Sequence, residues 1–342
     1  MKISYRTRRF LRRFATGLGI FLLIFILVYG LWVLWGKRYV VYTREGAKLD
    51  FSLQPMAEGE PVEETEPRPT VTLEQNAAND ALGTPGLLSQ SVGYYVDTDQ
   101  LADSVQNVRR SIEQLPAGTA VMLDLKSKFG FFYYNTHVNH GSVATAVDIG
   151  AMDELINWLG HSDLYVIARI PAFRDRAFGL EQQEAGLPVA SGALWSDDDA
   201  CYWLDPASEI TRDYLLSIIQ ELQLLGFDEV VFTEYDFPDT DAIVYDESVD
   251  RGDLLEETAD FLVEQGARGN FAVSFQSDNP EFPMPQGRSR LFLTGVEASE
   301  AAAVAASTGL PNPVVDLVFL TEVNDTRFNA FGVLRPMPIT AE

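Results

Sequence analysis

The sequence predicts an α/β protein: a (β/α)8 TIM-type barrel preceded by a single transmembrane helix and a disordered linker. Three observations lead to this prediction. Residues 92–336 alternate between eight short β-rich runs and longer helical stretches. Residues 17–36 carry no charge, and residues 44–90 are rich in Glu, Pro, Gln, Ala and Thr. The expected parts are a basic cytoplasmic tail (1–16), a transmembrane helix (17–36), an extracytoplasmic linker (37–90) and the barrel (91–342).

The charge of the chain is strongly uneven. The 342 residues have a formal net charge of -25, and residues 1–38 hold eight Lys or Arg and no Asp or Glu. The rest of the chain therefore carries -33, which would repel nucleic acid phosphates, so no nucleic acid partner is expected. Cys201 is the only cysteine. The sequence therefore contains no intramolecular disulfide and no cysteine metal site, and we expect no cofactor.

The uncharged run, GLGIFLLIFILVYGLWVLWG, is long enough to cross a lipid bilayer. Twenty helical residues at about 1.5 Å each span roughly 30 Å of hydrocarbon. Six basic residues precede the run, and this bias keeps the N-terminus cytoplasmic and sends the barrel outside. A cleaved signal peptide is the alternative, but its apolar region is usually about 7–15 residues long. An uncleaved signal anchor, giving a single-pass cell membrane protein, fits the run better.

The linker sequence, with EGEPVEETEPRPT at its centre, contains too few apolar residues to offset the entropy lost on ordering. Proline and like charges favour an extended chain, so the linker would hold the barrel away from the bilayer.

The barrel strands are predicted from short runs of β-branched and aromatic residues. These runs are 93–97, 120–125, 164–170, 228–235, 271–275, 290–295, 315–320 and 330–336.

Helical stretches separate most of these runs, at 103–115, 151–160, 208–226, 253–266, 299–309 and, less clearly, 322–330. The clearest is 208–226, whose apolar residues recur at spacings of three and four and which ends at Gly226. A doubly wound open sheet is the alternative fold. It is less favoured, because no glycine-rich G-x-G-x-x-G motif follows the first strand.

Four segments carry a family resemblance: AVMLDLKSKFGFFYYN (120–135), LYVIARIPAFRD (164–175), WSDDDACYWLDPAS (195–208) and GFDEVVFTEYDFP (226–238). Together they resemble a glycoside hydrolase domain family of bacterial surface and spore-associated proteins, a barrel family related in fold to amylase-type enzymes. The resemblance covers roughly residues 92–340. It implies a TIM barrel, a glycan or polysaccharide substrate and hydrolytic activity.

The chain departs from this family at the end of the fourth predicted strand. The family strand carries an Asp and an Arg near its end. When the two are aligned on Phe237-Pro238, Thr233 occupies the Asp position and Asp236 the Arg position. Glu234 stands where the family has Tyr.

Glycoside hydrolysis needs two carboxyl groups, one as acid and one as nucleophile or base. In barrels these groups lie at the C-terminal ends of strands. Glu234 and Asp236 are the catalytic candidates, and the partner carboxylate is expected from another predicted strand end, at Asp97, Glu297 or Glu322. Asp124 also lies at a predicted strand end. In a regular strand, Thr233 and Glu234 would face opposite sides.

Other residues are candidates for substrate binding. Asp124 and Lys126 are two apart on one strand, and with Arg169 they should form a charged cluster that is structural, substrate-binding or both. Trp195 and Trp203 could stack on sugar rings, although packing of their loop against the barrel is the favoured explanation for each.

His137 and His140 raise a rival hypothesis, a metal-dependent deacetylase. No third ligand lies nearby, so a surface loop without a metal is favoured. Two alternatives to the glycoside hydrolase remain: a non-catalytic barrel that binds glycan, and an interaction scaffold of the cell envelope.

Overall fold

The structure is a computed structural model that describes residues 40–43, 46–49, 88–246 and 248–339. The chain divides into two units, residues 1–73 and 74–342, which we describe separately. In the first unit, β1 (Val40–Thr43) and β2 (Gly46–Leu49) form a two-stranded antiparallel sheet. This sheet lies in the segment predicted as a disordered linker. The β-branched and aromatic residues of Val40–Thr43 explain the difference, because they favour extended backbone.

The predicted membrane segment, residues 17–36, lies outside the described residues, as does most of the predicted linker. Among the helices that the structure does describe, none has the length and apolar character needed to cross a bilayer.

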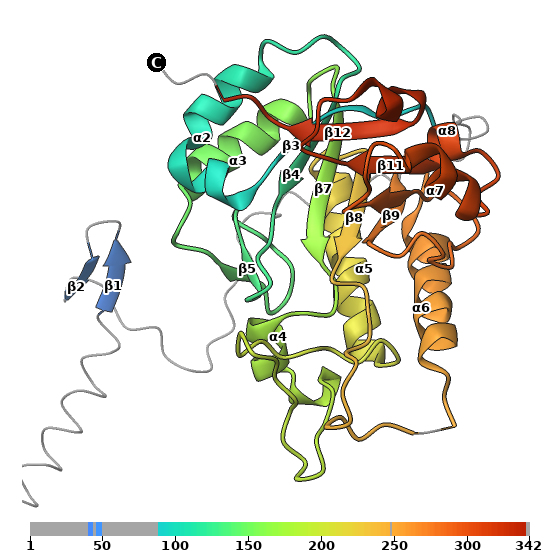
Figure 1. The fold of residues 1–342 in the computed structure, drawn as a ribbon. Helices are drawn as coiled ribbons and strands as arrows, with labels where there is room; N and C mark the ends of the chain where they lie inside the picture. The colour runs from blue at the N-terminus through green and yellow to red at the C-terminus, as the bar shows by residue number, and fades with distance from the viewer. Residues whose placement is uncertain (1–39, 44–45, 50–87, 247, 340–342) are drawn as a thin grey trace, which may run out of the picture. The chain divides into compact units, whose positions relative to one another are not determined.

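The second unit is a closed barrel of eight parallel strands (Figure 1). They are β3 (Val92–Val96), β4 (Ala120–Asp124), β7 (Tyr165–Pro171), β8 (Glu229–Thr233), β9 (Ala272–Ser277), β10 (Leu291–Leu293), β11 (Leu317–Leu320) and β12 (Gly332–Pro336). Neighbouring strands follow chain order, and β12 pairs with β3 to close the ring. The predicted (β/α)8 barrel is therefore confirmed.

The helices are α2 (Thr98–Ile112), α3 (Ile149–Leu159), α4 (Arg176–Glu181), α5 (Glu209–Leu224), α6 (Arg251–Gly266), α7 (Ala301–Ser307) and α8 (Pro313–Asp316). Helix α2 begins before the predicted helix 103–115. The Asp97 side chain accepts a hydrogen bond from the backbone N–H of Gln100, whose own side chain bonds back to Asp97. This capping box fixes the early start. The predicted helix 322–330 is only a 3-10 turn, Thr326–Ala330.

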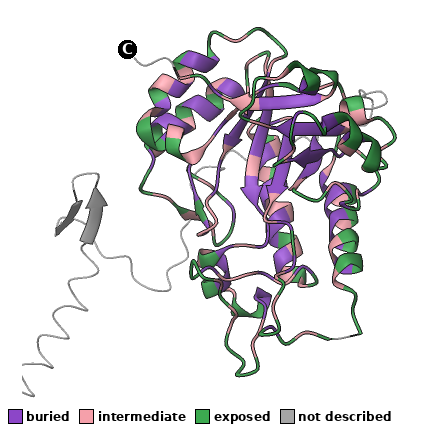
Figure 2. Ribbon diagram, viewed as in Figure 1, coloured by how far each residue is buried: buried purple, intermediate pink, exposed green. Residues whose placement is uncertain are grey.

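The barrel interior is a packed core rather than a pore. Alternate strand residues fill it, and Met122, Ile167, Val231 and Phe292 are fully buried there. A larger apolar layer lies between the strands and the helices. In Figure 2 the barrel strands are coloured mostly as buried. At the N-terminal end of the barrel, Arg290 forms a buried 2.5 Å ion pair with Glu229.

Two insertions lie beyond the C-terminal ends of the strands. After β4, the short strands β5 (Phe131–Phe132) and β6 (Ser142–Val143) pair in parallel. Between β7 and α5, a long connection contains α4 and the 3-10 turn Gln183–Ala185. Figure 1 shows β7 and β8 pointing toward the end of the barrel at which α4 lies.

Candidate active site

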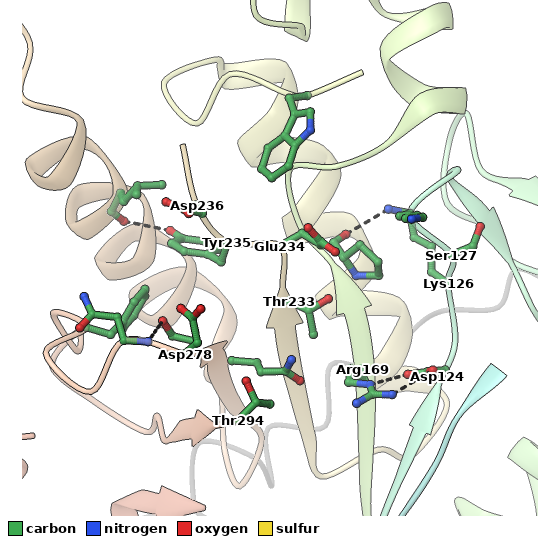
Figure 3. Close-up of a pocket in the computed structure, with 18 of the residues that line it drawn as sticks. Asp124, Lys126, Ser127, Arg169, Thr233, Glu234, Tyr235, Asp236, Asp278 and Thr294 are labelled. Carbon is green, nitrogen blue, oxygen red and sulfur yellow. Dashed lines mark hydrogen bonds and ion pairs between the residues drawn. The ribbon is translucent and has the colours of Figure 1, made fainter. Parts of the chain in front are cut away.

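A cavity of about 820 Å³ lies at the C-terminal ends of β4, β7, β8 and β9 (Figure 3). Its lining includes six of the predicted site residues: Asp124, Lys126, Arg169, Trp203, Glu234 and Asp236. Residues that sequence reasoning did not select complete the cavity, among them Gln276, Asp278 and Phe282. The site therefore stands where barrel enzymes carry theirs.

The floor of the cavity continues the alternation of the barrel interior. Arg169 lies two residues beyond the buried Ile167, and Asp124 two beyond Met122. Arg169 binds Asp124 through two hydrogen bonds, of 2.5 Å from Nε and 3.0 Å from Nη2. The Thr98 backbone N–H and hydroxyl also donate to Asp124, at 3.1 and 3.2 Å. Asp124 is thus held by four hydrogen bonds, and the predicted pairing of Asp124 with Arg169 is present.

Lys126 does not join that pair. Its Nζ lies 2.8 Å from Asp175 Oδ2 and donates to the Pro171 carbonyl at 3.1 Å. Both side chains of the Lys126–Asp175 pair are 0% exposed. Asp124, Lys126 and Arg169 line the same cavity, as predicted, but the expected pairing of Lys126 within this cluster is wrong. Strand β4 ends at Asp124, so the strict alternation on which that prediction rested no longer applies two residues later.

Asp175 is the partner that sequence reasoning missed, although it closes the IARIPAFRD segment. It also accepts hydrogen bonds from the Tyr214 hydroxyl at 3.0 Å and from the Phe178 backbone at 2.8 Å, and so caps α4. Its position directly before a short helix was the available signal.

Glu234 reaches the cavity because the backbone turns sharply at the end of β8. The strand ends at Thr233, and Glu234 adopts a left-handed conformation with φ of 49°. Thr233 and Glu234 therefore both line the cavity, rather than facing opposite sides as a regular strand would require. A non-glycine residue in this conformation is strained, and such strain is concentrated at functional sites.

Asp236 and Asp278 both lie to the left of Glu234 in Figure 3. Partial burial raises the pKa of Asp236, although the residue as a whole is exposed. A 2.7 Å hydrogen bond from the Phe237 backbone opposes this rise, whereas the negative charges of Asp278 and Asp239 add to it. Asp236 therefore keeps its proton to higher pH than an ordinary aspartate, as a general acid requires.

Arg174 links Glu234 to the loop that carries Trp203. Its guanidinium lies 3.7 Å from Glu234 Oε1, 2.5 Å from Asp197 and 2.6 Å from Asp199. Burial alone would raise the pKa of Asp197, but hydrogen bonds from Arg174, the Cys201 backbone and the Trp203 indole lower it to about 2. Asp197 is thus ionised at neutral pH and holds both Arg174 and Trp203 in place.

Four predicted site residues lie outside the cavity lining: Asp97, Trp195, Glu297 and Glu322. The Asp97 carboxylate is occupied as the cap of α2. Trp195 packs 6.4 Å from Trp203, which leaves only Trp203 at the cavity. Glu297 and Glu322 are exposed. A position at a predicted strand end was therefore not enough to identify the acidic residues that line the cavity.

His137 and His140 contact two different glutamates. His140 lies 2.6 Å from Glu181, and His137 lies 3.6 Å from Glu221. Within the described ranges of the chain, no group of three His, Cys, Asp or Glu side chains is placed to hold a metal ion.

Residues 94–272, about half of the chain, match the family described as "Putative glycosyl hydrolase domain". The chain belongs to this family. Curated proteins gave no match.

Among solved structures, a hypothetical protein from Ruminiclostridium thermocellum is 19% identical, covering 54% of this chain and 96% of its own, with a TM-score of 0.46. An inactive mutant of the GH20 exo-beta-N-acetylglucosaminidase from Vibrio harveyi is 8% identical over 72% of this chain, with a TM-score of 0.50. The alpha-galactosidase from Lactobacillus brevis is 9% identical over 73%, with a TM-score of 0.49. The chain spans only 50% and 38% of the length of these two hydrolases. At 8% identity, the likeness to the Vibrio harveyi enzyme is one of fold alone.

Proposed function

We propose that this protein is a membrane-anchored, extracytoplasmic glycoside hydrolase that acts on a polysaccharide or cell-wall glycan. One observation carries the proposal. Glu234 and Asp236, two residues apart at the end of β8, line the same cavity at the catalytic end of a barrel of this family. Two carboxyl groups at one site are what glycosidic bond cleavage requires.

The two carboxyl groups have different surroundings, which suits different roles. Asp236 has a raised pKa and would donate the proton to the leaving oxygen. Glu234 has the positive charge of Arg174 beside it, 3.7 Å away, and would act as the nucleophile or the base. Trp203 lines the cavity, is only partly buried and offers an aromatic face for a sugar ring.

A second candidate function is a non-catalytic barrel that binds glycan. Two observations favour it. Thr233 stands where the family has Asp, and the Asp124 carboxylate already accepts four hydrogen bonds within the protein, which leaves it poorly placed to act as an acid or nucleophile. In this case Glu234 and Asp236 would only bind sugar hydroxyls.

Turnover by the full-length protein across a panel of polysaccharides and cell-wall glycans separates the two functions. We expect Glu234→Gln and Asp236→Asn each to lower turnover by about 10²–10⁴-fold, the usual contribution of one positioned acid or base. Glu297→Gln, an exposed carboxylate outside the cavity, is the control and should leave turnover unchanged. Glycan binding without turnover of any substrate would establish the second candidate.

Membrane anchoring rests on the uncharged run 17–36 and the basic residues before it. Protease added to intact cells should release a fragment that begins within residues 44–90. A barrel fully protected from protease would contradict this orientation.

A further inference from the structure

We infer that Gln276 determines which sugar the cavity accepts, by binding a hydroxyl group of an uncharged sugar at the cavity floor. This inference rests on the proposed function and names the substrate class for the same site. It follows from the hydrogen bonds that the polar side chains of this floor do not make within the protein.

Three uncharged polar side chains line the cavity at the C-terminal ends of the neighbouring strands β8, β9 and β10: Thr233, Gln276 and Thr294. Gln276 is the central one. Phe275 packs in the apolar layer between strands and helices, so the alternation of β9 turns Gln276 toward the barrel axis. Thr233 and Thr294 likewise lie two residues beyond the inward-facing Val231 and Phe292. The three side chains thus continue the barrel interior into the cavity.

The protein itself does not use these three side chains for hydrogen bonding. Among the residues that the structure describes, none of the three side chains has a hydrogen-bond partner, and the Gln276 carbonyl oxygen, Oε1, is buried without a donor. The rest of the polar floor differs, because Arg169 and Asp124 are joined by two hydrogen bonds. The β8–β10 part of the floor therefore has free hydrogen-bonding groups.

The unpaired oxygen makes Gln276 unfavourable for folding. A carbonyl group that loses its water on burial and gains no donor destabilises the native state, whereas an apolar side chain of the same size would not. Folding therefore gives no reason for an amide at this position. A ligand does, because binding sites commonly contain groups that lower stability in exchange for function.

The chemistry of the amide limits the ligand. Its oxygen needs a donor and its nitrogen needs an acceptor, and a sugar hydroxyl can pair with either atom once this long side chain rotates. The ionised carboxylate of a uronic acid only accepts, so it would leave the oxygen unpaired. Thr233 directly precedes Glu234, so a sugar held on this part of the floor lies beside a proposed catalytic carboxylate. The inferred ligand is a neutral sugar with free hydroxyl groups.

Binding of neutral and acidic oligosaccharides to the full-length protein tests the inference. The probes are the tetrasaccharides of glucose, galactose, N-acetylglucosamine and galacturonic acid, measured by titration calorimetry. We expect a neutral tetrasaccharide to bind most tightly. Gln276→Met keeps the size of the side chain and should lower this affinity roughly two- to tenfold, the contribution of one neutral hydrogen bond. The same change should raise the urea midpoint, because it removes the unpaired oxygen.

Ser289 provides a matched control. Its hydroxyl is also buried without a partner in the described part of the chain, but Ser289 precedes β10, at the other end of the barrel, and does not line the cavity. Ser289→Ala should also raise the urea midpoint, and it should leave oligosaccharide binding unchanged.

Four results would overturn the inference: tightest binding of the galacturonic acid tetrasaccharide, no binding of any probe, an unchanged affinity of Gln276→Met, or a lowered urea midpoint of that variant. The last result would show that the amide stabilises the fold. Turnover of the same tetrasaccharides keeps the two proposals separate. Weaker binding by Gln276→Met, without turnover by the wild type, would remove the hydrolase and retain the role of Gln276. Turnover that Gln276→Met leaves unchanged, with unchanged affinity, would do the reverse.

Discussion

Lys126 and Asp175 form an ion pair of 2.8 Å in which both side chains are fully buried. The pair joins the end of β4 to the start of α4, beside the cavity. Gly130 is part of the same arrangement. Its φ is 86°, and a Cβ atom there would lie 2.0 Å from Asp175 Oδ1. The loop after β4, with Lys126 and Gly130, and the start of α4 are distant in sequence and are fitted around one carboxylate.

Breaking this pair should be costly. Lys126→Met and Asp175→Asn should each lower the free energy of unfolding by about 3–5 kcal/mol, because each leaves an uncompensated buried charge. Urea denaturation of the full-length protein measures the loss. Lys128→Met is the matched control: the Lys128–Asp199 pair is 35% and 51% exposed, and its loss should cost at most about 1 kcal/mol. Equal effects of Lys126→Met and Lys128→Met would contradict the buried pairing.

The Asp124–Arg169 pair should contribute less, because its side chains are 16% and 18% exposed. Asp124→Ala should lower the free energy of unfolding by about 1.5–3 kcal/mol, the usual range for hydrogen bonds to a charged group. Thr98→Val removes only one hydroxyl donor to Asp124 and should cost about 0.5–1.5 kcal/mol. A larger loss for Thr98→Val than for Asp124→Ala would show that the carboxylate is not the centre of this network.

The barrel strands were predictable because they are buried on both faces. Such strands are continuous apolar runs, as in Val121–Leu123 and Val230–Phe232, and all eight lie within two residues of their predicted positions. The helix ends were less certain, since they depend on side-chain caps. Helix α2 begins at Thr98, five residues before the predicted start, because the Asp97 side chain caps it. The spacing of apolar residues does not reveal such a cap.

The site was predicted only in part. Asp124, Arg169, Glu234 and Asp236 were found from their positions at strand ends. Lys126 was assigned the wrong partner, because its ion pair with Asp175 depends on the path of the chain after β4. Asp278 was missed because β9 runs to Ser277, two residues beyond the predicted strand, so that Asp278 follows it directly. The turn at Glu234 could not be predicted, since glutamate has no preference for positive φ.

That turn gives a prediction about stability. Glu234→Gly and Glu234→Ala both remove the carboxylate, but only glycine adopts a φ of 49° without steric cost. We expect the glycine variant to be more stable than the alanine variant by about 1 kcal/mol, the lower limit of the cost of this conformation. Thermal or urea denaturation gives the comparison. If alanine is equally stable, Glu234 does not adopt the left-handed conformation in solution.

The raised pKa of Asp236 should affect activity and stability in the same direction, because both decline as pH rises through it. As the general acid, Asp236 must be protonated, so kcat/KM should fall as pH rises through its raised pKa. Asp278→Asn removes one of the charges that raise this pKa, so the alkaline limb should move to lower pH, whereas Glu297→Gln should not move it.

Stability follows from the same shift. Folding favours protonated Asp236, so its favourable contribution is fully present below the unfolded pKa and is lost as pH rises through the folded value. Asp236→Asn, which cannot ionise, should therefore gain stability over the wild type as pH rises toward neutrality, while losing turnover. A urea midpoint that falls relative to the wild type over this range would mean that folding favours the ionised carboxylate. Asp236 could not then be the general acid. Both its role as an acid and its effect on stability depend on a raised pKa, and both have the same causes, burial and the charge of Asp278.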